Sequence, residues 1–266
     1  MVAAEIRRGA VAAPHGRALS VLEYHLVSYR RTWRASALST LVLPLLIMLG
    51  FGVGVGSFVN GGVAGVRYLD WLVPGLVAST AAQVAIGEAT WPVFSCFEWI
   101  RVYFAQAAAP LRVADILAGH LGYMLFRILV SATVFLAASV AFSAVHSWWA
   151  PLTLVVSLLT GLAVAAPTVA YSARVSSDSY LAILLRLAVL PMSLFSGVFF
   201  PVESLPLGWR WVAYALPLWH GVDLSRDAML GTAPGLLGAW HVGYLSAWCA
   251  VGWWLAHRQF RRRLVV

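Results

Sequence analysis

Charged residues are scarce in this sequence, and lysine is absent. Only 11% of the 266 residues are Asp, Glu, Lys or Arg, against about 25% in a typical soluble domain. Together with the 61% hydrophobic content, this scarcity excludes an ordinary soluble domain and indicates an integral membrane protein. At about 20 residues for each spanning helix, the chain holds about six spans and leaves no room for a folded extramembrane domain.

The sequence also lacks the motifs of common enzymatic chemistry. It has no Walker A sequence, no His-Glu-x-x-His motif and no Gly-x-Ser-x-Gly elbow. The histidines are scattered, and none pairs with another at the spacing of metal ligands. The cysteines, Cys96 and Cys249, predict neither a disulfide nor a metal site. We therefore expect no catalytic residue, no ATP hydrolysis and no metal in this chain.

The arginines indicate topology. A net charge of +8 would suggest nucleic acid as a partner of a soluble protein, but here most arginines flank apolar runs, so no nucleic acid is expected. Of those flanking arginines, only Arg67, Arg210 and Arg226 fall in segments expected outside, which predicts that both termini face the cytoplasm. The use of arginine alone, with much Ala, Val and Gly, suggests a bacterial genome of high GC content.

Hydrophobic patterning divides the chain into four parts. Residues 1–18 are expected to be flexible, and 19–34 to form an amphipathic helix at the membrane surface. Residues 35–257 form the transmembrane domain, and the basic tail 258–266 should lie against anionic lipid. The predicted spans are 35–59, 69–94, 117–142, 151–171, 181–200 and 236–257. The predicted fold is all-α, with six transmembrane helices.

The stretch 192–221 is predicted to be a broken membrane segment. Prolines interrupt it, and between them lies a helical turn rich in Trp and Tyr. Such rings settle at a membrane interface, which predicts an external helical hairpin that dips into the bilayer and returns. A plain loop with an aromatic anchor is the alternative. The residues assigned to this re-entrant element are Pro201, Glu203, Pro206, Trp209 and Pro217.

Glu88 and Arg127 are charged residues inside predicted spans. Burying a charge there is costly, so Glu88 and Arg127 are expected to pair. A proton relay is the alternative for both, and Arg127 could instead face an anionic substrate group. Gly50 and Gly54 form one small-xxx-small pair, and Gly52 and Gly56 form another; such pairs let another helix approach closely. We therefore expect another helix to pack closely against the end of the first span.

The sequence is similar to ABC-2 type exporter permeases, most closely to the nodulation lipo-oligosaccharide and daunorubicin-resistance permeases. The resemblance rests on Ser196-Gly197-Val198-Phe199-Phe200-Pro201, followed by Glu203, Leu205-Pro206, Pro217-Leu218, Asp223 and Arg226. It implies a unit of two permease chains, identical or paralogous, and two cytoplasmic ABC ATPase subunits. Within that unit, the first span and the end of the fifth span are expected to contact the second permease chain. ATP and Mg²⁺ would bind in those partners, and this chain would hold no cofactor.

The same resemblance implies that the polar and aromatic stretch 95–117 is a coupling helix that contacts the ATPase. From the residues alone, a solvated helix at the membrane interface is an equally good interpretation. The predicted ATPase-coupling residues are Phe97, Glu98, Arg101, Pro110, Arg30 and Arg31. Aromatic residues of the first and fifth spans are expected to line a lateral substrate cleft, namely Phe51, Phe195, Phe199 and Phe200.

These expectations describe a multi-pass plasma-membrane permease subunit that exports an amphipathic lipid, glycolipid or drug-like molecule. Membrane lipids surround it, and it is not itself an enzyme. Two alternatives remain. An ion-coupled secondary transporter would use Glu88 and Arg127 as relay groups. A membrane-embedded lipid-modifying enzyme would need ionisable residues gathered on one face, which the sequence does not show.

Overall fold

A computed structural model describes residues 14–58, 62–63, 65–232 and 236–265. The described chain is helical, and its one β-bridge joins Val63 and Val66. The elements in order are α1 Pro14–Ile47, a π-helical segment Met48–Gly54, a 3-10 turn Val55–Phe58, α2 Tyr68–Ala89, α3 Trp91–Glu98, α4 Val102–Ala107, α5 Val113–Ala141, α6 Leu152–Ser172, α7 Ser179–Leu184, a π-helical segment Leu185–Val189, α8 Leu190–Phe195, a 3-10 turn Val202–Ser204, α9 Leu207–Ala215, α10 Pro217–Leu230 and α11 Leu236–Leu264.

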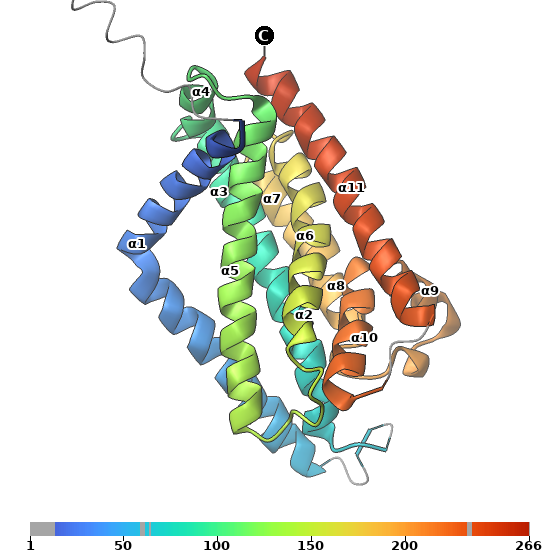
Figure 1. Cartoon of the computed structure of the whole chain (residues 1–266). Coiled ribbons are helices and arrows are strands. Elements are labelled where there is room, and N and C mark those ends of the chain that lie inside the picture. Colours follow the sequence, from blue (N-terminus) through green and yellow to red (C-terminus); the bar gives the residue numbers. More distant parts are fainter. Residues whose placement is uncertain (1–13, 59–61, 64, 233–235, 266) are drawn as a thin grey trace, which may run out of the picture.

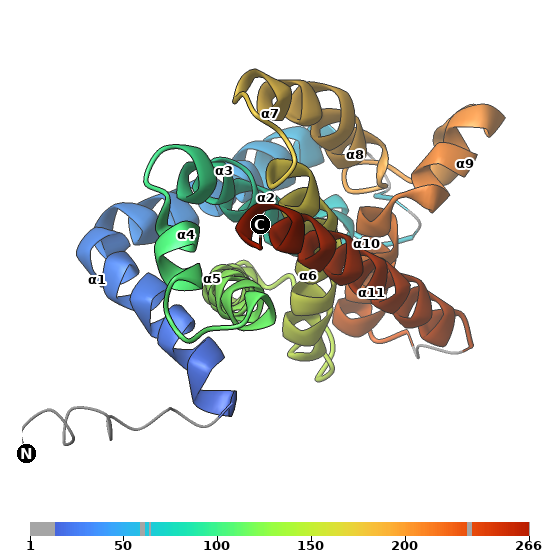
Figure 2. The ribbon, with the colours of Figure 1, turned by 90° about the horizontal axis from the view of Figure 1, so that it is seen from above.

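The long helices form a bundle around α2. Figure 1 shows α4 and the C-terminal end of α11 at one end, which we call the inner end after the expected topology. The start of α2 and the loop after α5 lie at the opposite, outer end. Viewed from the inner end, α1 and α9 lie at opposite edges (Figure 2). Helix α2 is central, because 78% of its most apolar stretch is buried inside the protein.

The core has an inner and an outer part. The inner cluster joins α3, α4, the start of α5 and the end of α11 through Phe97, Tyr103, Ile116 and Phe260. The outer cluster joins the start of α2 and the end of α5 to the segment after α8 and to α10. Each cluster therefore ties the long helices to one of the irregular segments, the α3–α4 turn or the α9–α10 hairpin.

Among the described residues, three helical stretches are long and apolar enough to cross a membrane: 68–98, 113–141 and 152–172. The segment 179–195 is apolar but shorter. The number of six spans therefore remains a prediction for α1, α7–α8 and α11.

Several boundaries differ from the sequence-based expectation. Helix α1 runs through the expected junction at residues 34 and 35, although Figure 1 shows that it bends about halfway. The fifth apolar segment ends at Phe195 rather than Phe200, because Gly197 turns the chain with a φ of +74°. Residues 1–13 of the expected flexible terminus lie outside the described part.

Two further boundaries change at the C-terminal side. Arg226, expected in an external segment, is buried in α10, which also contains Asp223 and Asp227. The basic tail continues α11 as far as Leu264. Charged residues next to an apolar run can continue a helix when neighbouring elements supply hydrogen-bond or ion-pair partners. This explains why α10 includes Arg226 and why α11 includes Arg263.

Prolines and glycines explain the shape of the hairpin. Pro201 and Pro206 have extended backbones before short helical turns, and Pro217 is the first residue of α10, where its missing N–H is not needed. Gly231 ends α10 with a φ of +81°. Gly221 has no room for a side chain, because a Cβ at this position would overlap the side chain of Thr160 in α6. Helices α10 and α6 therefore approach closely at this point.

Candidate functional site

The predicted coupling segment folds into a compact structure that we call the inner hub, formed by Phe97, Glu98, Tyr103, Phe260 and Arg263. The ring of Phe97 lies 4.7 Å from that of Tyr103 and 4.9 Å from that of Phe260. All three rings are buried. The α3–α4 turn is therefore packed onto the last helix. Phe97, one of the predicted coupling residues, is only 1% exposed, so most of its ring packs inside the hub.

Arg263 connects three segments at the hub. Its guanidinium pairs with Glu98 and lies 4.5 Å from the centroid of the Phe97 ring. It also donates a hydrogen bond to the Ala173 carbonyl oxygen after α6, at 3.2 Å. Arg263 was expected to lie on lipid with the rest of the basic tail. It is instead partly buried, whereas its neighbours Arg261 and Arg262 are exposed. Sequence reasoning missed this role because the pattern shows only a run of arginines.

A groove opens at the surface of the hub. It has a volume of about 300 Å³ and is lined by Phe97, Glu98, Arg101, Phe104 and Arg263. Three of the predicted coupling residues, Phe97, Glu98 and Arg101, therefore line it together. The groove offers both signs of charge beside aromatic rings, which suits a protein segment carrying polar and apolar side chains.

The other predicted coupling residues lie elsewhere. Pro110 is exposed in the turn that leads to α5. Arg30 and Arg31 are exposed on α1, where Arg31 lines a separate shallow surface with Glu23 and Tyr24. The structure therefore does not gather the six predicted residues into one surface.

A buried polar chain extends from the hub to α1. The Tyr103 hydroxyl lies 2.7 Å from His120 Nδ1, and the rings of His120 and His25 are 4.4 Å apart. Burial raises the pKa of Tyr103 well above its usual value, so the phenol is the donor to a neutral imidazole. Burial also lowers the pKa of His25 to about 4. Neither histidine was singled out from the sequence, because they are far apart along the chain.

Glu88 and Arg127 form the expected pair. Arg127 Nε lies 3.2 Å from Glu88 Oε1, and both side chains are mostly buried. The Arg127 guanidinium also lies 4.7 Å from the centroid of the Tyr29 ring. Each charge thus has a partner across α2 and α5, which offsets the cost of burying it.

The predicted cleft residues divide into two groups. The rings of Phe51 and Phe199 are 5.3 Å apart, between the π-helical segment after α1 and the chain after α8. Phe195 stacks on Trp209 at 5.0 Å. Phe195 also lines a largely apolar cavity of about 280 Å³ with Met192, Trp209, Leu216 and Trp248 among other residues of α2 and α6 to α11. Phe200 is half-buried and belongs to neither group.

The hairpin is held largely through backbone carbonyls. Arg226 donates to the Gly197 carbonyl and, at 3.3 Å, to that of Trp71, and its guanidinium lies 3.7 Å from the centroid of the Trp71 ring. Tyr244 of α11 donates to the Ala215 carbonyl at 2.6 Å. Arg210 donates to the Leu205 carbonyl at 2.7 Å. Glu203 itself is exposed and contributes its backbone carbonyl to Arg210.

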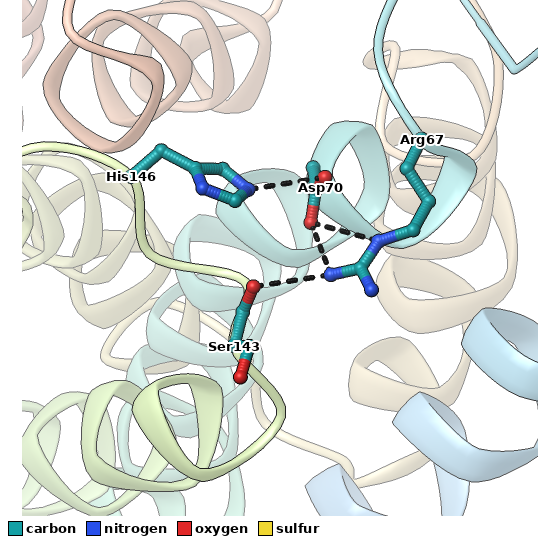
Figure 3. A network of polar contacts seen from close by, with 4 residues as sticks. All are labelled: Arg67, Asp70, Ser143 and His146. Atoms are coloured by element: carbon teal, nitrogen blue, oxygen red, sulfur yellow. Dashed lines mark hydrogen bonds and ion pairs between the residues drawn. The ribbon is translucent and has the colours of Figure 1, made fainter.

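A second polar network closes the outer end of the bundle (Figure 3). Asp70, at the start of α2, accepts from Arg67 at 2.7 Å and lies 3.1 Å from His146 Nε2. Arg67 also donates to the Ser143 carbonyl at 3.1 Å. These contacts join α2 to the loop between α5 and α6. Within the described residues, no group of three His, Cys, Asp or Glu side chains is arranged to hold a metal ion.

Comparison with known proteins agrees with this architecture. Residues 18–230 match the ABC-2 type transporter family. The chain belongs to that family. It is 31% identical over 249 residues to Nodulation protein J of Rhizobium leguminosarum bv. trifolii, an alignment that covers 93% of this chain and 94% of the relative. Nodulation protein J of Rhizobium meliloti (strain 1021) is 30% identical, with the same coverage of both chains. The protein is thus an ABC-2 membrane permease with apolar helices.

Proposed function

We propose that this permease is the membrane subunit of an ATP-driven exporter and that the inner groove receives its ATPase. ABC-2 permeases normally work with an ABC ATPase subunit. The observation that carries the proposal is the groove formed by Glu98, Arg101 and Arg263, with its mixed charges beside aromatic rings. ATP and Mg²⁺ bind in the ATPase partners, and the chain itself supplies the contact and the path.

The hub gives the groove a mechanical connection to the span it packs on. Because Phe97, Tyr103 and Phe260 are packed together, a displacement of the α3–α4 turn carries the end of α11 with it. When nucleotide closes the ATPase partners, this displacement shifts the permease between two populations, one of which opens a lateral cleft to the outside.

A second permease chain completes the path. The expected unit contains six spans per chain, with both termini inside and the α9–α10 hairpin outside. Support comes from the exposed apolar side chains of the segment 179–195, Leu187, Leu190 and Leu194, and from Leu49 and Phe51 after α1. Gly50 has no atom within 4 Å of the position that a Cβ would take, so its surface is open to another helix. A copy of this chain and a paralogue both fit this surface.

The cargo is an amphipathic lipid, glycolipid or drug-like molecule. Two groups of rings, Phe51 with Phe199 and Phe195 with Trp209, offer apolar contact. The charges of Glu88 and Arg127, inside predicted spans, are already paired. An apolar body is therefore accommodated more readily than an ionic one.

Affinity purification from native membrane tests the proposal. We expect an ATPase subunit to be recovered in a fixed ratio, and Glu98→Arg to keep the permease in the membrane while uncoupling ATP hydrolysis from transport. Glu23→Arg is the matched control, because it makes the same charge change on α1 away from the groove. Normal coupling in Glu98→Arg would contradict the assignment of the groove.

The alternative function is that of an ion-coupled secondary transporter. It requires transport by the isolated permease in vesicles, driven by a proton gradient without ATP. Loss of that activity in Glu88→Gln would then assign the Glu88–Arg127 pair to a relay rather than to a structural role.

A further inference from the structure

Two histidines that are far apart in the sequence meet where the hairpin packs on the last helix. His220 lies in the first turn of α10, and His241 lies in α11. Their Nδ1 atoms are 2.7 Å apart, and the side chains are only 2% and 4% exposed. The outer nitrogens also have partners. His220 Nε2 lies 3.0 Å from the Tyr214 carbonyl oxygen, and His241 Nε2 lies 3.2 Å from Asp223 Oδ2.

The partners determine where the protons lie. A carbonyl oxygen only accepts, so His220 Nε2 must carry a hydrogen and donate it to Tyr214. A neutral imidazole has one N–H, which leaves His220 Nδ1 as an acceptor. The bridging proton between the two rings must then belong to His241 Nδ1. All of these bonds are formed with His220 neutral.

One additional proton completes the network. With its hydrogen on Nδ1, a neutral His241 would point the lone pair of Nε2 at the carboxylate of Asp223, and two acceptors repel. Protonation of His241 turns that contact into an ion pair with a hydrogen bond. A further proton on His220 would place two N–H groups face to face at 2.7 Å. All of the hydrogen bonds form when the two rings together carry one proton more than two neutral imidazoles. With fewer or more protons, at least one of these contacts becomes repulsive.

We propose that His220, His241 and Asp223 form a proton-binding site that holds the α9–α10 hairpin on α11 only in its singly protonated state. The Asp223 side chain is 42% exposed, so the site can exchange protons with its surroundings although both rings are buried. The proposal concerns the attachment of the hairpin and does not depend on the cargo or on the ATPase.

The surrounding groups leave this proton count unchanged. From α10, Asp227 interacts electrostatically with His241, and Arg226 interacts with Asp223. From α11, Tyr244 stacks on His220 with ring centroids 4.0 Å apart. Helix α9 contributes the carbonyl of Tyr214, and α6 faces α10 at Gly221 with the uncharged Thr160.

The outer network of Figure 3 provides an internal comparison. His146 also contacts an aspartate, Asp70, but Asp70 already has a permanent cation in Arg67. No second imidazole fixes the hydrogen of His146 on Nδ1 in that network, so His146 can donate from Nε2 while neutral. The contact between His146 and Asp70 therefore needs no additional proton.

Hydrogen exchange of the full-length permease in lipid nanodiscs, measured from pH 5 to 9, tests the proposal. Each variant is compared with wild type at the same pH, so the intrinsic chemistry of exchange cancels. In Asp223→Asn, the amide N–H can donate to the neutral Nε2 of His241, which satisfies the network without the additional proton. On the alkaline side we expect the wild-type hairpin, residues 207–222, to exchange faster than Asp223→Asn by roughly tenfold to a hundredfold.

Two further variants complete the test. His241→Phe should exchange faster than Asp223→Asn at every pH, with α5 as an internal reference for intact folding. His146→Gln should follow wild type in the hairpin. Equal alkaline exchange in wild type and Asp223→Asn, or hairpin protection in His241→Phe that matches Asp223→Asn, would overturn the proposal.

Discussion

The two irregular segments of this permease are both attached to α11, but by different chemistry. At the inner hub, side chains contact side chains: three buried rings pack together, and Arg263 pairs with Glu98. The outer hairpin is attached to α11 by Tyr244, which donates to the Ala215 carbonyl, and by the contact between His220 and His241. Arg226 holds it to α2 and to the segment after α8 by donating to the carbonyls of Trp71 and Gly197. A broken helix in an apolar environment exposes carbonyls that need donors, whereas the short inner turn can rely on water for some of its own. The outer attachment should therefore tolerate substitution less than the inner one.

The largest effect is expected from Arg226→Met. This variant keeps an apolar side chain against Trp71 but removes the donors to the carbonyls of Gly197 and Trp71. Leaving those buried acceptors unpaired should lower the free energy of unfolding by roughly 2–4 kcal/mol. Thermal unfolding of the purified permease in detergent measures the change. Arg258→Met, an exposed arginine on α11, is the matched control and should unfold near the wild-type temperature.

A second prediction concerns the close approach of α10 to α6. Gly221→Ala should destabilise the protein by roughly 1–3 kcal/mol, because its Cβ would overlap Thr160. Gly87→Ala in α2 has open space at the Cβ position and should instead be stabilising by up to about 1 kcal/mol. Thermal unfolding of the two variants compares them directly. Recovery in the double variant Gly221→Ala with Thr160→Ala would confirm the overlap, and an unchanged Gly221→Ala would refute it.

We expect the stability of the protein to depend on pH through His25, near the inner end. His25 has a folded pKa of about 4, lowered by burial, so protonation favours the unfolded chain. Its stabilising effect is complete above the unfolded pKa of about 6.5 and is lost as the pH falls toward 4. We expect a loss of up to about 2 kcal/mol at pH 4.5. The unfolding temperature of His25→Leu should fall less between pH 7 and 4.5 than that of wild type; equal slopes would contradict the assignment.

The smallest change in stability is expected at the Glu98–Arg263 pair, whose side chains are 28% and 26% exposed. Such a pair contributes about 1 kcal/mol or less. Arg263→Glu should lower the unfolding temperature slightly, and Glu98→Arg together with Arg263→Glu should recover it. Thermal unfolding of the single and double variants forms a double-mutant cycle. A cycle with no interaction energy would show that the aromatic rings alone hold the hub.

The comparison of the two segments also shows what the sequence could predict. Pro201, Pro206 and Pro217 located the breaks of the hairpin, because proline limits the backbone wherever it occurs. Glu98 and Arg101 were expected on one surface because they are close in the sequence, and both line the groove. In each case the signal was local.

The missed features all join distant residues. Arg263 follows Glu98 by 165 residues, and His241 follows His220 by 21. Arg226 was placed in an external segment because a lone arginine next to an apolar run indicates an interface, and only the fold supplies the carbonyls of Gly197 and Trp71. Pairings of this kind depend on which helices are neighbours, which hydrophobic patterning does not specify.

The central claim is that the ATPase binds at the inner groove, and site-specific photocrosslinking tests it most directly. A benzophenone amino acid in place of Phe104, which lines the groove and is 39% exposed, should capture the ATPase subunit in native membranes. The same group in place of the exposed Trp148, at the outer end, should not capture it. Capture from position 148, or no capture from position 104, would contradict the account.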